Sequence, residues 1–206
     1  MKANQPFNIV LLGGPGSGKG TQAKLIKTKY GLEHLSTGAL FRHEIAIRSG
    51  IGIIAQQAID KGNYCPDNLT LNMLNQHINA SGNTKGFIFD GVPRTIHQAK
   101  MMDGIDYSPI VPVSLVIYIF VEDAEIEKRI LGRANEENRS DDNPEVIKQR
   151  IRNFHQLTEP LIQYYSEQNK LMSVNGMQPI NEVFNAIDHI LSTHENFENE
   201  QYSCII

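Results

Sequence analysis

A glycine-rich segment with a single lysine is the clearest chemical feature of the sequence. Residues 13–21 read GGPGSGKGT and stand between a short apolar run and a stretch with a helical pattern. Glycines let successive backbone N–H groups point inward at phosphate oxygens, and the following helix N-terminus adds the positive end of its dipole. Lys19 can then reach the β- and γ-phosphates, and Thr21 can bring a hydroxyl to Mg²⁺. Strand, loop, lysine and helix stand in the order that predicts a nucleoside triphosphate site.

Two other expected strand ends lead into arginines. In HLSTGALFR, Ser36 or Thr37 can cap the next helix and Arg42 follows within two turns. In FIFDGVPRTIHQA, Asp90 at the tip of an apolar strand suits a carboxylate that holds the water shell of a metal. Taken alone, Arg42 is explained as well by a solvated side chain, and Arg94 by a surface ion pair.

A third group of arginines lies between two helical stretches, in RILGRANEENRSDDNPEVIKQR. One interpretation is a solvated helix–loop–helix of mixed charge. The other is a mobile flap whose planar guanidinium groups close over phosphates, which they bind better than lysine does. The arginines concerned are Arg129, Arg133, Arg139 and Arg150.

This set of residues suits the transfer of a phosphoryl group to another phosphate. No histidine or aspartate stands out as a base for deprotonating an alcohol. A phosphate acceptor needs no such base, because its second ionisation near about pH 6 leaves it largely dianionic at neutrality. Catalysis is then mainly alignment, exclusion of water and neutralisation of charge.

The elements that position these residues alternate between strand and helix. Apolar runs predict strands at about residues 7–12, 32–36, 86–90, 113–121 and 171–175. Helical patterns lie between them, among others at residues 19–30, 38–49, 67–79 and 144–168. Such alternation predicts an α/β fold with a five-stranded parallel sheet and helices on both faces. Ligands then bind beyond the carboxyl ends of the strands.

Composition excludes several other classes of protein. The 206 residues suffice for one sizeable domain, and a net charge of −4 without a basic tract argues against nucleic-acid binding. Cys65 and Cys204 form neither a disulfide framework nor a zinc motif. The N-terminal residues lack a signal-peptide core, and no run approaches transmembrane length. We therefore expect a cytoplasmic protein with no membrane association and a monomeric state by default.

GGPGSGKGTQ, LSTGALFR, DGVPRTIHQA and GR…RSDDNPEVIKQR, in this order, resemble the adenylate kinase family from about residue 7 to residue 191. The Lys-Gly-Thr ending of the glycine-rich loop, with Gly20 between the two side chains, is that family's own form. The resemblance implies a P-loop NTPase-like fold, Mg²⁺ as cofactor, and ATP, AMP and ADP as partners. It also implies one domain over residues 1–192, with an acceptor-binding insert at about 36–80, a short lid at about 133–141 and a polar tail at 193–206. The short lid carries no zinc ligands, so we expect no zinc.

The resemblance also assigns roles to individual residues. For ATP it implies Gly16, Ser17, Gly18, Lys19, Gly20, Thr21, Arg129, Arg133 and Gln178. For AMP it implies Thr37, Gly38, Arg42, Asn63, Tyr64, Cys65, Gly91, Arg94, Gln98, Arg139 and Arg150. The catalytic residues are expected to be Lys19, Arg94, Arg133, Arg139 and Arg150, with Thr21 and Asp90 holding Mg²⁺ largely through water.

Two departures from the family pattern leave alternatives open. The family normally has a carboxylate at the position of Ala39 and an aromatic residue at that of Val92, and both positions are expected to lie at the acceptor site. A degenerate adenylate-binding paralogue with weak turnover is therefore one alternative, and a kinase for UMP or CMP is another. Thr37 and Gln98 favour AMP over the pyrimidine nucleotides. A GTPase-like switch is a third alternative, but it needs a base-reading motif such as N-K-x-D, which this sequence does not contain.

Overall fold

The computed structural model contains one parallel sheet in the strand order β2-β3-β1-β4-β5. It describes residues 6–82, 84–104, 112–137 and 143–194, except for the side chains of residues 133–137. The strands are β1 (Ile9–Leu12), β2 (Glu33–Ser36), β3 (Phe87–Asp90), β4 (Leu115–Phe120) and β5 (Leu171–Asn175). The α/β fold and all the predicted strands are thereby confirmed, with ends within two residues of the expected ones.

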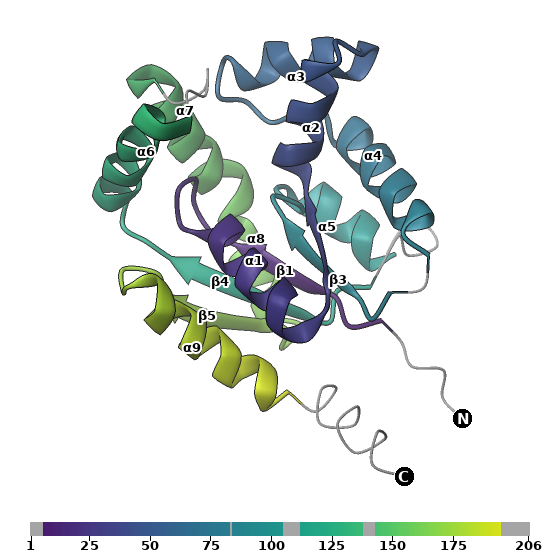
Figure 1. Cartoon of the computed structure of the whole chain (residues 1–206), viewed down its shortest axis with the longest axis vertical. Helices are drawn as coiled ribbons and strands as arrows, with labels where there is room; N and C mark the ends of the chain where they lie inside the picture. Colours follow the sequence, from purple (N-terminus) through teal and green to yellow (C-terminus); the bar gives the residue numbers. More distant parts are fainter. Residues whose placement is uncertain (1–5, 83, 105–111, 138–142, 195–206) are drawn as a thin grey trace.

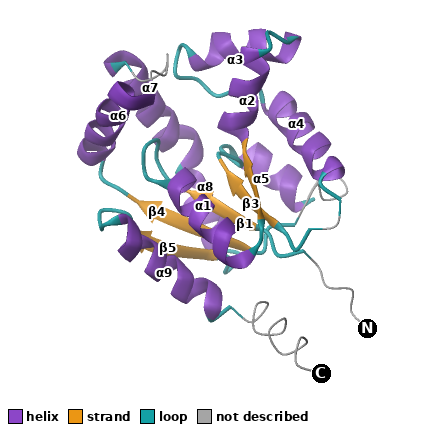
Figure 2. Ribbon diagram, viewed as in Figure 1, coloured by secondary structure: helices purple, strands orange, loops and turns teal. Residues whose placement is uncertain are grey.

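Helices cover both faces of this sheet (Figures 1 and 2). They are α1 (Lys19–Tyr30), α2 (Thr37–Ala46), α3 (Gly50–Ile59), α4 (Asp67–Ala80), α5 (Ile96–Asp103), α6 (Asp123–Glu137), α7 (Pro144–Asn153), α8 (Pro160–Ser166) and α9 (Ile180–Ser192). Val10 and Leu12 of β1 pack against α4, α5 and α8, whereas Ile9 and Leu11 face α1 and α9. This alternation follows from the two-residue period of a strand, and burial on both faces explains why the central strand β1 is apolar throughout.

Two smaller apolar clusters lie outside the sheet. The α6–α7 pair buries its own set of Val121, Ile126, Ile130, Ile147 and Ile151. The α2–α4 region has another, which contains Phe41, Ala55, Cys65 and Met73. Figure 1 shows the α6–α7 and α2–α3 pairs above the same end of the sheet.

The predicted helix at residues 38–49 was wrong at its end. Helix α2 stops at Ala46, Arg48 adopts a positive φ of 56°, and Ser49 caps the separate helix α3 through the backbone N–H of Gly52. Positive φ is rare outside glycine, so the residue type of Arg48 does not indicate this break, although Ser49 is a preferred N-cap residue.

The predicted long helix at residues 144–168 was also wrong in its continuity. Helix α7 ends at Asn153, a π-helical turn, η1 (Phe154–Thr158), follows, and α8 begins at Pro160. Proline has no N–H and its ring crowds the preceding turn, so a regular α-helix is disfavoured there. The wider turn is closed instead by the Glu159 N–H donating to the Phe154 carbonyl at 2.8 Å.

Candidate active site

The glycine-rich loop, residues 13–21, connects β1 to α1 at the carboxyl edge of the sheet. The Lys19 ammonium folds back over this loop and donates to the carbonyls of Gly13 (2.9 Å) and Gly14 (2.7 Å) and to Ser17 Oγ (3.3 Å). Gly16 and Gly18 adopt φ of 75° and 95°. At Gly16 an added Cβ would also come within 2.8 Å of Ile130 Cγ1, so this position requires glycine. The predicted phosphate loop is thus curled around its lysine, at the N-terminus of a helix that can accept an anion.

Asp90 lies beside the start of α1. Its carboxylate Oδ2 is 3.3 Å from His34 Nε2, and a Cβ added at Gly20 would be 3.4 Å from the same oxygen. Burial by itself would raise the pKa of Asp90, but the hydrogen bond with His34 and the positive charges of Lys19 and Arg94 outweigh it and hold that pKa below its usual value. Asp90 is therefore an ionised carboxylate at neutral pH and sits close to the phosphate loop.

A cleft of about 700 Å³ opens in front of this loop. Helix α6 contributes Arg129, whose guanidinium donates to Glu125 at 2.8 Å and to the Gly176 carbonyl at 3.0 Å. The second bond joins Arg129 to the turn between β5 and α9. The predicted residues that line the cleft are Gly16, Gly18, Lys19, Gly20, Thr21, Gly38, Arg42, Tyr64, Asp90, Gly91, Arg94, Arg129 and Arg150.

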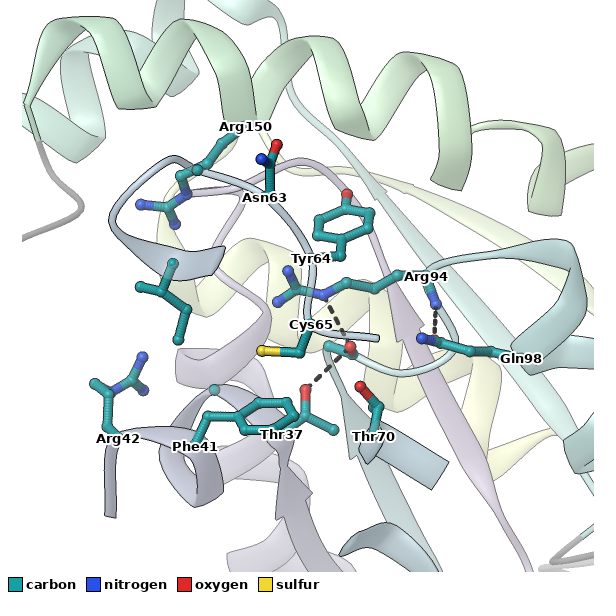
Figure 3. Close-up of a pocket in the computed structure, with 14 residues that line it drawn as sticks. Thr37, Phe41, Arg42, Asn63, Tyr64, Cys65, Thr70, Arg94, Gln98 and Arg150 are labelled. Carbon is teal, nitrogen blue, oxygen red and sulfur yellow. Dashed lines mark hydrogen bonds between the residues drawn. The ribbon is translucent and has the colours of Figure 1, made fainter. Parts of the chain in front are cut away.

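A second pocket, of about 90 Å³, lies beside the cleft between α2, α4, α5 and α7 (Figure 3). Its lining includes every predicted AMP residue that the structure describes: Thr37, Gly38, Arg42, Asn63, Tyr64, Cys65, Gly91, Arg94, Gln98 and Arg150. The lining is completed by Gly62 and by three residues that the resemblance did not supply, Phe41, Ile59 and Thr70. Burial raises the pKa of the Cys65 thiol to about 11 against the opposing charge of Arg94, so this thiol stays protonated.

Arg94 is held in this pocket through both its side chain and its backbone. Its Nε donates to the Gly91 carbonyl at 2.8 Å, and its backbone N–H donates to Gln98 Oε1 at 2.7 Å. Thr37 Oγ1 donates to the same Gly91 carbonyl at 3.0 Å. A Cβ at Gly91 would lie 2.7 Å from Thr37 Oγ1 and 3.1 Å from Arg94 Nη2, at a φ of 86°. The backbone of Gly91 therefore serves as the surface on which both side chains are positioned.

Gln98 is buried and is held at both ends of its amide. Besides accepting from the Arg94 N–H, it donates from Nε2 to Asp67 Oδ1 at 2.8 Å, and Asp67 also accepts from Thr95. These bonds leave the second amide hydrogen and the second carbonyl lone pair of Gln98 for another partner. The side chain is thus fixed in a position on the pocket wall, as a base-reading group requires.

Several predicted residues are placed elsewhere. Ser17 is buried beneath the loop, and Gln178 is exposed and is not among the residues that line the cleft. Arg133 belongs to α6, but its side chain is outside the described part of the structure. Arg139 lies outside the described residues altogether. Val92, expected at the acceptor site, is instead 1% exposed in the core under the sheet. Ala39 does line the cleft.

Four supporting residues were missed by sequence reasoning. His34 holds Asp90, Asp67 holds Gln98, and Asn153 and Thr158 contact the loop that carries Tyr64. His34 stands directly before the motif LSTGALFR, but no motif gives any of the four its supporting role, and the contact between Thr158 and Tyr64 spans 94 positions.

The described residues contain neither a membrane-spanning helix nor a cluster of metal ligands. No helix among them combines the length and apolar character needed to cross a bilayer. Within those same ranges, no three His, Cys, Asp or Glu side chains gather in a way that could hold a metal ion. Binding of Mg²⁺ through Thr21, Asp90 and phosphate oxygens needs no such cluster.

Comparison with known proteins identifies the family. The family model described as Adenylate kinase matches residues 11–170. An adenylate kinase of Parabacteroides distasonis is 43% identical over 181 residues, which is 88% of this chain and 95% of the relative. The adenylate kinase of Stenotrophomonas maltophilia is 40% identical over 177 residues (86% and 95%), and that of Flavobacterium psychrophilum 38% over 187 residues (90% and 98%). A match of this extent, over a chain that carries the phosphate loop and the arginine-lined pocket, shows that this protein belongs to the adenylate kinase family.

Proposed function

We propose that this enzyme transfers the γ-phosphoryl group of ATP to AMP and so forms two molecules of ADP, reversibly. The observation that carries the proposal is that two adjacent regions, the cleft at the phosphate loop and the smaller pocket beside it, share one set of side chains. Arg42, Arg94 and Arg150 line both the cleft at the phosphate loop and the smaller pocket beside it. A donor phosphate on the loop and an acceptor phosphate in the pocket then meet at the same guanidinium groups, which neutralise both.

The proposed mechanism needs positioning rather than proton transfer. An oxygen of the AMP phosphate forms a bond to the γ-phosphorus, and the bond from that phosphorus to its bridging oxygen on ADP breaks. Lys19 and the loop N–H groups bind the donor, Arg94 orients the acceptor, and the cleft limits access of water. Arg133 and Arg139 of the proposed lid, at about residues 133–141, join these groups when the lid covers the phosphates.

Residues of the site fit Mg²⁺ as the cofactor. Asp90 is ionised, lies beside Gly20, and lines the same cleft as Thr21. Carboxylate and hydroxyl oxygens suit this ion, which keeps several of its waters. Mg²⁺ bound there neutralises charge on the phosphates. Thr21 and Asp90 therefore orient the metal's waters in this proposal.

We assign the remaining roles as follows. Arg129 and the turn that carries Gly176 flank the adenine of ATP, and Gln98 reads the adenine of AMP. The insert at about residues 36–80 forms the acceptor side. We further propose that the enzyme acts as a monomer in the cytoplasm on ATP, AMP and ADP, without nucleic acid, membrane or zinc.

The first prediction concerns the reaction itself. Purified protein with ATP and Mg²⁺ is expected to form ADP with AMP as acceptor, and to use UMP or CMP at least about 100-fold less efficiently. The reason is that a fixed amide at Gln98 is left unpaired by the wrong base. A coupled assay of ADP formation measures kcat/KM for each acceptor. Comparable turnover of UMP or CMP would contradict the assignment of AMP, and binding without turnover would favour the degenerate paralogue.

The second prediction concerns Ala39, the departure that favours that alternative. Ala39 faces the cleft in the first turn of α2. The family resemblance implies a carboxylate at this position, close to the water shell of the metal. We expect Ala39→Asp to raise kcat by up to about 10-fold, or to lower the Mg²⁺ concentration needed for half-maximal rate, because ligands in the outer shell of a metal matter to that extent. The KM for AMP should change little.

A matched control is Ala46→Asp, which adds the same charge to the exposed end of the same helix, away from the cleft. If Ala39→Asp and Ala46→Asp behave alike in both kcat and Mg²⁺ dependence, the metal argument is wrong. Ala39 is then a helix position at which alanine is simply the best helix former.

A further inference from the structure

Residues 62–65, in the segment that joins α3 to α4, are hydrogen-bonded to helix α7. Asn153 at the end of α7 donates to the Gly62 carbonyl (2.8 Å) and to Asn63 Oδ1 (3.2 Å). A Cβ added at Gly62 would stand 2.8 Å from the Val146 carbonyl, so the backbones are in close contact. We call residues 62–65 the acceptor loop. Its position is thus set by α7 rather than by its own helices alone.

Tyr64 projects from this loop over Arg94. The Arg94 Cζ lies 4.7 Å from the centroid of the Tyr64 ring, and Figure 3 shows the ring and the guanidinium together at the pocket wall. A guanidinium within about 6 Å of an aromatic face is attracted by the ring's quadrupole, more strongly when it is partly desolvated. Both side chains are half-buried. The ring therefore acts directly on the group proposed to orient the acceptor phosphate.

The hydroxyl of Tyr64 is linked to Arg94 by a second route. It lies 2.9 Å from Thr158 Oγ1, and Thr158 Oγ1 donates to the Arg94 carbonyl at 2.9 Å. A threonine hydroxyl has one hydrogen, and that hydrogen is used on a carbonyl, which can only accept. The Tyr64 O–H must therefore be the donor to Thr158. The two hydrogen bonds thus run in one direction: Tyr64 donates to Thr158, and Thr158 donates to the Arg94 carbonyl.

Thr158 occupies the last position of the π-helical turn, two residues before Pro160 starts α8. Turns of this kind occur often at functional sites, because they reposition a side chain that a regular helix would place elsewhere. Here the wide turn presents the Thr158 hydroxyl to both partners. Arg94 is thus held at its guanidinium by Gly91 and Tyr64, and at its backbone by Gln98 and Thr158.

We propose that Tyr64 is a positioning residue for Arg94: its ring fixes the plane of the guanidinium, and its hydroxyl fixes the ring through Thr158. The proposal rests on the proposed function, since it concerns the acceptor side of that reaction. It goes beyond lining of the base pocket, which would require only bulk at this position. It assigns to Tyr64 an effect on the acceptor phosphate that is exerted through another side chain.

The test compares Tyr64→Phe and Tyr64→Leu by steady-state kinetics with AMP and ATP varied separately. Tyr64→Phe keeps the ring and should lower kcat/KM for AMP by about 3-fold, as loss of one neutral hydrogen bond does. Tyr64→Leu also loses the ring and should lower it by about 10-fold. The KM for ATP should stay within about 2-fold of wild type, because the phosphate loop is untouched.

Tyr164→Phe is the matched control, because Tyr164 donates to Asp103 Oδ2 at 2.9 Å away from both cavities. It should lose stability without any change in AMP kinetics. If Tyr64→Phe leaves kcat/KM for AMP at the wild-type value, or if both variants raise the KM for ATP and AMP equally, the positioning role is overturned. Tyr64→Phe decides this point even if Tyr64→Leu is too unstable to assay.

A double-mutant cycle with Arg94→Lys separates positioning from simple packing. If Tyr64 acts by orienting the guanidinium, Tyr64→Leu should cost less than about 3-fold in the Arg94→Lys background, because lysine lacks the planar group whose orientation the ring fixes. An undiminished 10-fold cost in that background would overturn the proposal. Failure of the wild type to form ADP from ATP and AMP would instead refute the proposed function, and the positioning role with it.

Discussion

Lys19→Met is expected to lower kcat by about 100- to 1,000-fold, the effect of removing one preorganised donor from a site where charge is redistributed. Methionine is close to lysine in length and shape, so the change removes charge and hydrogen bonds while leaving volume nearly constant. In the structure the ammonium donates to Gly13, Gly14 and Ser17, so it is already held within the loop. Steady-state rates at saturating ATP and AMP give the loss in kcat, and calorimetry gives the affinity for ATP.

Lys27→Met provides the comparison for Lys19→Met. Lys27 lies on the same helix, in its exposed last turn, and loses the same charge without touching the loop. Its kcat should stay within about 2-fold of wild type, because surface charges contribute little. Retention of more than a tenth of wild-type kcat by Lys19→Met would contradict the role of the phosphate loop.

Arg94→Lys is expected to lower kcat/KM for AMP by about 100-fold, although the formal charge is unchanged. Lysine cannot reproduce the planar fork that reaches the Gly91 carbonyl at 2.8 Å while the guanidinium lies under the Tyr64 ring. It also cannot bind a phosphate through two parallel N–H groups. The loss should appear mainly in the acceptor half of the kinetics, as a higher KM for AMP together with a lower kcat.

Arg152→Lys tests whether this loss is specific. Arg152 is exposed on α7 and donates only to Gln149 in the described structure, at 2.7 and 3.2 Å. It lines neither cavity, so its replacement should leave AMP kinetics unchanged. Equal losses in Arg94→Lys and Arg152→Lys would show that the effect arises from general damage to the fold.

The predictable parts of the site are those that depend on residues close together in the sequence. The phosphate loop needs glycines at fixed offsets from a lysine, and the buried parallel strands need continuous apolar runs, so both leave local patterns. The pocket residues came from family motifs, and the structure brings the described ones together. The strands, the loop and most of the pocket residues could therefore be predicted from the sequence.

The parts that escaped prediction depend on contacts between distant segments or on rare backbone states. The bond between Tyr64 and Thr158 and that between Asn153 and Gly62 join elements about 90 positions apart, with separations of 94 and 91. Arg48 lies between α2 and α3 and adopts a positive φ although it is not a glycine. Val92 was misplaced because a motif shows which residues recur together, but not which of them turns toward the core.

Division of the apolar interior into separate clusters has a consequence for hydrogen exchange and local opening. The α6–α7 cluster and the α2–α4 cluster are each far smaller than the two that cover the sheet. Opening of either small cluster exposes little apolar surface, so the free energy of that opening is at the low end of the range for local unfolding. The sheet, by contrast, opens only when the whole molecule unfolds. Amide protons of α2, α3, α6 and α7 can therefore exchange while those of β1 and β4 remain protected. The two groups of helices can accordingly fluctuate independently of each other, while the more stable sheet holds the phosphate loop and Asp90 in place at the cleft.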